Sequence, residues 1–188
     1  KLYVFNKNEN IGFIKGHMCS PAIATQAEDL IAGGVKELIH VGYAEDLQPE
    51  LVPGEIILTD GAFNDTAVAR LYGYDYDIIH SSKDLTNEIE SMITSAEIPY
   101  KRGIHWTTDA GYRETWVQVM DYRDKGALCV EMEGVGLFTI ANYRKCVATG
   151  IYVVSDVYSE NDWKLGWEGN DIKRAVGAVI DMIIESIR

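Results

Sequence analysis

Two carboxylates flank a single methionine in the segment Glu131-Met132-Glu133, which directly follows the apolar run at residues 127–130. The run has the length and β-branched content of a short buried strand, and the residues after it have helical spacing. The carboxylates therefore follow the end of a predicted strand, where open α/β sheets bind ligands. Taken alone, the pattern fits two solvated loop carboxylates equally well, because exposed acids are the rule.

Three other segments place reactive side chains at predicted strand ends or before a helix: residues 16–20, 40–46 and 155–162. In an α/β sheet such segments can converge on one cleft. Acids together with aromatic rings suit a ligand that carries hydroxyls and a flat ring. A carboxylate can accept hydrogen bonds from two vicinal hydroxyls, and a separate acid can protonate a leaving group.

Strands and helices alternate along most of the chain, which predicts a mixed α/β fold without repeats. The order of strand 11–15, helix 22–31 and strand 35–42 predicts a parallel right-handed crossover. Residues 43–54, 61–76 and 157–170 are predicted as loops. The predicted strands are 1–5, 11–15, 35–42, 55–60, 101–107, 127–130 and 148–155, and the predicted helices are 22–31, 82–96, 115–125, 134–143 and 171–187.

Composition limits the classes of function. The chain has 188 residues with 47% hydrophobic and 24% charged side chains, which indicates one globular domain. A net charge of -12 argues against a nucleic-acid partner. Cys19, Cys129 and Cys146 form no C-x-x-C pair, so neither a disulfide framework nor a metal site is predicted, and a cytoplasmic protein is expected. An apolar run long enough to span a membrane is absent from the sequence.

Four segments in this order resemble the nucleoside phosphorylase/nucleosidase superfamily, and most closely its hexamer-forming branch of purine nucleoside and uridine phosphorylases. They are residues 130–133 (VEME), Ser155-Asp156 after an apolar strand, residues 107–115 (TTDAGYRET) and Gly16-x-x-x-Ser20-Pro21. The resemblance implies one nucleoside phosphorylase-like domain over residues 1–188. It also implies a three-layer α/β/α fold with a central mixed, partly barrel-like sheet, and homo-oligomers, either dimers or a trimer of dimers.

The resemblance also implies roles for individual residues. Glu133 would bind the 2′- and 3′-hydroxyls of a ribose, with Met132 and Glu131 beside it. Asp156 would be the general acid that protonates the purine ring as the glycosidic bond breaks, and an Asp at this position favours purine over uridine substrates. The candidates for the base pocket are Ser155, Tyr112 and Trp106. The expected partners are a nucleoside and phosphate as co-substrate, without a cofactor.

The phosphate region, for which Gly16, His40 and Tyr43 are the candidates, departs from the family. Similar phosphorylases have Arg in I-R-V-G followed by Ser or Thr, whereas this chain has His40 and Tyr43. A histidine is mostly neutral at pH 7 and cannot form a bidentate fork to phosphate. Glu45 replaces a common glycine with a carboxylate. The family's N-terminal G-D-P-x-R loop is also missing, so the domain is expected to lack its N-terminal segment.

Three functions follow from this pattern and these departures. The first is phosphorolysis of a purine nucleoside to free base and ribose 1-phosphate. The second is hydrolysis by water, which the altered phosphate region favours. The third is a degenerate family member that binds a nucleoside without turnover. Asp156 could also be only a helix cap.

Overall fold

The computed structural model describes residues 1–5, 8–159, 162–166 and 169–186. Within these ranges a seven-stranded mixed sheet has the order β5-β4-β6-β7-β3-β8-β9, and an additional β4–β8 pairing closes its middle into a barrel. The strands are β1 (Leu2–Phe5), β2 (Asn8–Ile14), β3 (Glu37–Asp46), β4 (Ile56–Asp65), β5 (Ile78–His80), β6 (Lys101–Thr108), β7 (Cys129–Glu131), β8 (Val147–Ser159) and β9 (Asp162–Leu165). The predicted mixed, partly barrel-like sheet is therefore confirmed.

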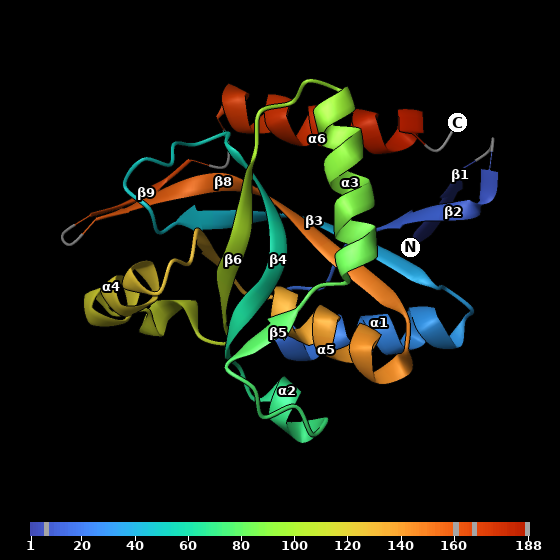
Figure 1. The fold of residues 1–188 in the computed structure, drawn as a ribbon, viewed down its shortest axis with the longest axis horizontal. Coiled ribbons are helices and arrows are strands. Elements are labelled where there is room, and N and C mark those ends of the chain that lie inside the picture. Colours follow the sequence, from blue (N-terminus) through green and yellow to red (C-terminus); the bar gives the residue numbers. More distant parts are fainter. Residues whose placement is uncertain (6–7, 160–161, 167–168, 187–188) are drawn as a thin grey trace.

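Helices cover the barrel on two sides (Figure 1). The helices are α1 (Ser20–Ala32), α2 (Val68–Leu71), α3 (Lys83–Ser95), α4 (Trp116–Asp124), α5 (Gly134–Arg144) and α6 (Asn170–Ser186), with a 3-10 turn at Gly111–Arg113. One apolar cluster joins α3 and α6 to β4 and β8, and another joins α1, α2 and α5. The resulting α/β/α arrangement agrees with the prediction.

The barrel interior is apolar at one level and polar at another. Ala44, Ile57, Cys129, Tyr152 and Val154 form a buried apolar cluster inside it. Polar groups from β4, β6 and β7 lie nearby, and they are fully buried. Buried polar groups must find partners. Here the polar groups of β6 form hydrogen bonds with the turn between β7 and α5.

Several elements differ from the sequence prediction. β3 and β4 continue to Asp46 and Asp65, through residues predicted as loops, because each pairs with neighbours on both sides. β9 and α2 lie in segments predicted as loops, and β5 lies between a predicted loop and a predicted helix, where no element was expected. The predicted crossover within one sheet is wrong, because β2 pairs with β1 in a separate two-stranded sheet.

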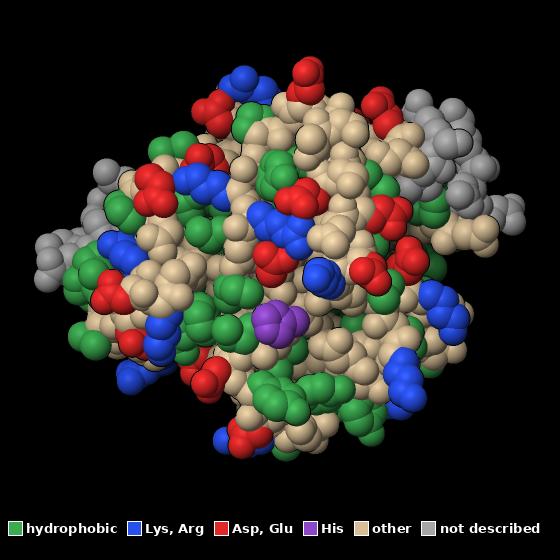
Figure 2. Space-filling view, viewed as in Figure 1, with side chains coloured by type: hydrophobic (Ala, Val, Ile, Leu, Met, Phe, Trp, Pro, Cys, Tyr) green, Lys and Arg blue, Asp and Glu red, His purple; other side chains and the backbone are tan. Residues whose placement is uncertain are grey.

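Charged side chains of both signs are interspersed on the face shown in Figure 2, and lysine and arginine do not gather into a stripe there. In the described part of the chain, no helix is both long and apolar enough to cross a membrane.

Candidate functional site

The turn between β7 and α5 is organised by the carboxylate of Glu131, the last residue of β7. Its Oε1 accepts hydrogen bonds from His105 Nε2 at 2.9 Å, from the Thr107 hydroxyl and from the Gly134 amide at 3.0 Å. Its Oε2 accepts the amides of Glu133 at 2.8 Å and Gly134 at 2.9 Å. Glu131 is thus a buried carboxylate whose oxygens are fully engaged in holding the start of α5.

Burial alone would raise the pKa of Glu131, but the charge of His105 and the hydrogen bonds from His105 and Thr107 hold this pKa below its ordinary value. A carboxylate that accepts several N–H and O–H bonds is stabilised in its charged form. The group is therefore ionised near neutral pH, and its role in the isolated chain is to shape the turn.

Glu133 connects this turn to the start of α1. Its Oε1 accepts the backbone amide of Cys19 at 2.7 Å, and the Met132 carbonyl accepts the Ser20 hydroxyl at 3.0 Å. Cys19 precedes α1 with φ 73, and the strained backbone directs its amide to the carboxylate. Burial, followed by the negative charge of Glu131, raises the pKa of Glu133 to about 7.

Gly16 and His40, two of the candidates for the phosphate region, lie close together. A Cβ at Gly16 would lie 3.6 Å from His40 Nε2, and His40 Nδ1 lies 3.5 Å from the Tyr152 hydroxyl. Burial, partly opposed by Glu131 and reinforced by His105, lowers the pKa of His40. The imidazole is therefore neutral at pH 7 and is no substitute for an arginine. Tyr43 is 47% exposed and follows on the same strand.

Ser155 and Asp156 form the second carboxylate-bearing segment. The Ser155 hydroxyl lies 2.9 Å from Asp156 Oδ2 and 3.3 Å from the Ala44 carbonyl, and the Gly166 amide donates to Asp156 Oδ1 at 3.0 Å. An irregularity after Ala44 makes Glu45 the register partner of Asp156. Asp156 is thus held by hydrogen bonds to both oxygens. It lies within β8, which continues to Ser159, so its predicted place after the end of a strand is wrong, because β9 pairs with this part of β8.

The carboxyl group of Glu45 lies near Asp156, and that of Glu114 acts in turn on Glu45. Burial raises the pKa of Glu45 to about 8, and the negative charges of Glu114, Asp156 and Asp46 add to the effect. Burial also raises the pKa of Glu114 to about 7. These groups are partly or wholly protonated at neutral pH, so they can donate as well as accept hydrogen bonds.

The two predicted aromatic contacts for the base are not equivalent. Trp106 is fully buried and stacks on Tyr122 with ring centroids 4.3 Å apart. A ring enclosed in this way offers no free face to a base, so the structure does not support that prediction. Tyr112 is 98% exposed on the 3-10 turn, and its part in a base pocket stays a prediction.

Sequence reasoning missed His105, the partner of Glu131. It lies inside β6, where apolar flanks predicted only a strand. His105 and Thr107 lie two positions apart on β6, and Thr59 of β4 contacts His105. All three polar residues are fully buried. The signal for them was the alternation of polar residues in an otherwise buried strand (His105, Thr107), which predicts a polar lining of the sheet's inner face.

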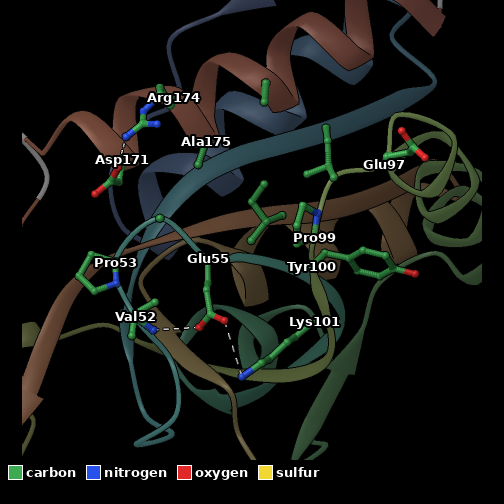
Figure 3. Close-up of a pocket in the computed structure, with 14 residues that line it drawn as sticks. Val52, Pro53, Glu55, Glu97, Pro99, Tyr100, Lys101, Asp171, Arg174 and Ala175 are labelled. Carbon is green, nitrogen blue, oxygen red and sulfur yellow. Dashed lines mark hydrogen bonds and ion pairs between the residues drawn. The ribbon is translucent and has the colours of Figure 1, made fainter.

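A pocket of about 520 Å³ lies elsewhere, between the start of β4, the start of β6 and α6 (Figure 3). Glu55 accepts the Val52 amide at 2.9 Å and lies 3.9 Å from Lys101, and Asp171 pairs with Arg174. None of the residues that line this pocket is a candidate site residue. This pocket is therefore separate from the candidate site residues.

The chain is similar to known proteins in sequence and in fold. The family model described as Phosphorylase superfamily matches residues 4–185. The purine nucleoside phosphorylase DeoD-type of Exiguobacterium sibiricum is 31% identical over 139 residues, which cover 72% of this chain and 59% of that protein. Its counterpart from Caldanaerobacter subterraneus subsp. tengcongensis is 32% identical over 156 residues, covering 77% and 67%.

A similar fold is found in a solved structure titled as an analysis of the P knowlesi homolog of P falciparum PNP. The TM-score is 0.74 at 23% sequence identity, over 87% of this chain and 66% of that one. This likeness concerns the fold. The chain spans 59% of the length of the Exiguobacterium sibiricum relative, so it corresponds to part of such a protein.

Proposed function

This chain belongs to the phosphorylase superfamily, and on that premise we propose that it cleaves the N-glycosidic bond of a purine nucleoside with phosphate, giving free base and ribose 1-phosphate. The observation that carries the proposal is that two carboxylates are held in place by hydrogen bonds, one at the start of α5 and one within β8. Glu133 is held on the Cys19 amide, and Asp156 is held by Ser155 and Gly166. One carboxylate suits a sugar, and the other suits a leaving base.

Cleavage of this bond builds positive charge on the sugar and negative charge on the base. Asp156 would deliver a proton to the ring nitrogen of the leaving base, which removes the charge that develops there. Glu133 would accept hydrogen bonds from the sugar hydroxyls, and its negative charge would stabilise the oxocarbenium-like sugar. Met132 would line the sugar, whereas Ser155 is fully buried and would hold the Asp156 carboxylate rather than contact the base.

Hydrolysis by water is the second candidate, because of the groups around His40. Gly16 and His40 lie together where phosphate is expected. Burial lowers the pKa of His40 and keeps its imidazole neutral. The other groups that shift this pKa are Glu131 and His105, and neither supplies the positive charge of a guanidinium or an ammonium group. A neutral ring attracts a dianion weakly. A binder without turnover is the third candidate and predicts no product with any nucleoside.

The assembly and setting of the protein are also proposals. A homo-oligomer, either a dimer or a trimer of dimers, is expected from the family resemblance. A cytoplasmic setting is supported by three free cysteines, since thiols persist in reducing compartments.

The deciding experiment incubates the full-length protein with inosine, adenosine, guanosine and uridine, each with and without phosphate, and measures free base, ribose and ribose 1-phosphate. Phosphorolysis predicts ribose 1-phosphate only when phosphate is present, and purine nucleosides as the substrates. Free ribose formed without phosphate would establish the hydrolytic alternative. No product with any nucleoside would contradict both enzymatic functions.

A further inference from the structure

The fully buried His105 of β6 contacts Glu131, which lies two residues before Glu133, the proposed sugar-binding residue. His105 Nε2 is 2.9 Å from Glu131 Oε1, and its Nδ1 is 2.6 Å from the Thr59 hydroxyl. Both ring nitrogens are thus engaged, one on β4 and one on β7. His105 has no exposed surface, so it cannot touch a substrate directly.

Because a carboxylate only accepts hydrogen bonds, the proton of this pair lies on His105 Nε2. The pair is buried at both ends, with exposed side-chain fractions of 0% and 1%. Removing one partner of such a pair leaves a buried group without compensation, which is far more costly than replacing the whole pair. The orientation of the Glu131 carboxylate therefore depends on the imidazole.

The orientation of Glu131 is transmitted along the backbone. Its Oε2 accepts the amide of Glu133, and both oxygens accept the amide of Gly134. These bonds fix the backbone from which the Glu133 side chain extends to Cys19. A rotated Glu131 carboxylate would release that amide and change the direction of the Glu133 side chain.

The close packing at the start of α5 indicates how tightly the imidazole is located. A Cβ on Gly134 would lie 2.5 Å from His105 Nε2 and 3.0 Å from Glu131 Oε1. Only a glycine leaves room for the ring at this distance. The position of the His105 ring on β6 therefore requires a glycine at position 134 of the turn.

We propose that His105 is a positioning residue, which fixes the Glu131–Gly134 turn and through it the carboxylate of Glu133 that would bind the sugar. The inference rests on the proposed function in its last step, because only a nucleoside-cleaving site gives Glu133 a sugar to bind. Its structural half, the coupling of His105 to the Glu133–Cys19 contact, stands without that function.

Two substitutions of His105 separate positioning from packing. His105→Leu replaces the ring by an apolar side chain of similar size and so removes the donor to Glu131. His105→Gln replaces the ring N–H by an amide N–H at the level of Nε2. Thr59→Val, which removes the hydroxyl at Nδ1 with little change in volume, is a milder perturbation that serves if His105→Leu fails to fold.

The matched control is Val179→Ala, a fully buried residue in the α3–α6 cluster. It lowers the melting temperature without touching the turn. A merely destabilised enzyme has fewer active molecules, so kcat falls and KM for the nucleoside stays. A displaced Glu133 weakens sugar binding, so KM itself rises, by about tenfold for the loss of a hydrogen bond to a charged group.

The experiment measures kcat and KM for the nucleoside and, in the same variants, the amide proton shift of Cys19 by NMR. We expect His105→Leu, or Thr59→Val in its place, to raise KM and to move the Cys19 resonance. We expect His105→Gln to restore both, and Val179→Ala to change neither.

The proposal would be overturned if His105→Leu, or Thr59→Val where His105→Leu does not fold, kept both KM and the Cys19 resonance of the parent. Absence of turnover in the parent protein would refute the proposed function instead. In that case the Cys19 resonance alone still decides, since an unmoved signal in His105→Leu or Thr59→Val refutes the coupling and a shifted one supports it.

Discussion

The Glu133 carboxylate accepts the backbone amide of Cys19 at 2.7 Å, although 114 residues separate the two in the chain. The contact joins the starts of α1 and α5, and the Ser20 hydroxyl reinforces it by donating to the Met132 carbonyl. Helix N-termini favour negative charge because their amides are unsatisfied. Here one such amide also orients a carboxylate toward the proposed sugar site.

Replacement of Glu133 by Gln tests its part in binding the sugar. The Gln side-chain oxygen can still accept the Cys19 amide, so we expect little loss of folding. The negative charge is lost, so we expect kcat/KM for the nucleoside to fall by roughly tenfold or more, as for hydrogen bonds to charged groups. Steady-state kinetics together with a melting curve measure both effects.

The parent enzyme should also show a matching pH dependence. Since burial and Glu131 raise the pKa of Glu133 to about 7, the carboxylate forms as the pH rises through that value. Nucleoside affinity should therefore increase between pH 6 and pH 8, and this increase should vanish in Glu133→Gln. The exposed Glu37 provides the control Glu37→Gln. Equal kinetics in Glu133→Gln and parent would contradict the assignment.

Replacement of Asp156 by Asn tests the general acid. The amide can keep the hydrogen bonds with Ser155 and Gly166, but it has no proton to give to the leaving base. We expect kcat for purine nucleosides to fall by about 10²–10⁴-fold, with an unchanged melting temperature. Product formation over time at saturating substrate measures the loss.

Asp181→Asn on the exposed side of α6 is the matched control, because it makes the same chemical change in solvent. A substrate whose leaving group needs no protonation should be cleaved by Asp156→Asn nearly as fast as by the parent. If Asp156→Asn instead cleaves inosine at the parental rate, Asp156 has only a structural role within β8.

The sequence predicted the candidate site segments from local patterns, whereas it placed the ends of several strands wrongly. The segments around Glu133, Asp156 and Gly16 were found because they follow or precede regular patterns in the chain. Strand ends and helix starts are local features, and local patterns reveal them. The roles of their residues came from the family resemblance.

Features that depend on pairing between distant segments could not be predicted from the residues, and only the family resemblance implied a partly barrel-like sheet. The extension of β4 through Gly61 to Asp65 is stabilised by β5 and β6 on its two sides. The β4–β8 pairing that closes the barrel joins segments almost a hundred residues apart along the chain, between Ile56 and Val153. His105 was missed for the same reason, since its function comes from Thr59 and Glu131 on other strands.

Two glycine substitutions should change stability in opposite directions. Gly134→Ala places a Cβ 2.5 Å from His105 Nε2, so the ring must shift, and we expect a loss of about 1–3 kcal/mol as in other overpacked cores. Gly177, inside α6, has no heavy atom within 4 Å of an added Cβ. Gly177→Ala should therefore stabilise the protein by about 0.5–1 kcal/mol, because glycine is unfavourable in helices.

Urea denaturation of both variants beside the parent measures these changes in the free energy of unfolding. The pair controls for the chemistry, since each substitution adds one methyl group to a helix. Gly134→Ala with parental stability would mean that the His105–Glu131 pair is loosely packed. That result would also weaken the argument that the turn is fixed by the imidazole.

The free energy of unfolding should fall as the pH rises, because of Glu45. Burial raises the pKa of Glu45 from 4.5 to about 8, and Glu114, Asp156 and Asp46 add to the shift. Between these values the folded protein holds a proton that the unfolded chain has released. Stability from this group is therefore present at pH 4.5 and is lost progressively up to pH 8.

Glu45→Gln should remove this dependence, since an amide resembles the protonated acid and does not titrate. At pH 5 we expect variant and parent to have nearly equal free energies of unfolding. At pH 8.5 the variant should be more stable by roughly 2–4 kcal/mol. Urea titrations at several pH values measure the difference, and Glu37→Gln controls for a carboxylate in solvent. A constant difference between Glu45→Gln and parent from pH 5 to pH 8.5 would show that the pKa of Glu45 is not raised by folding.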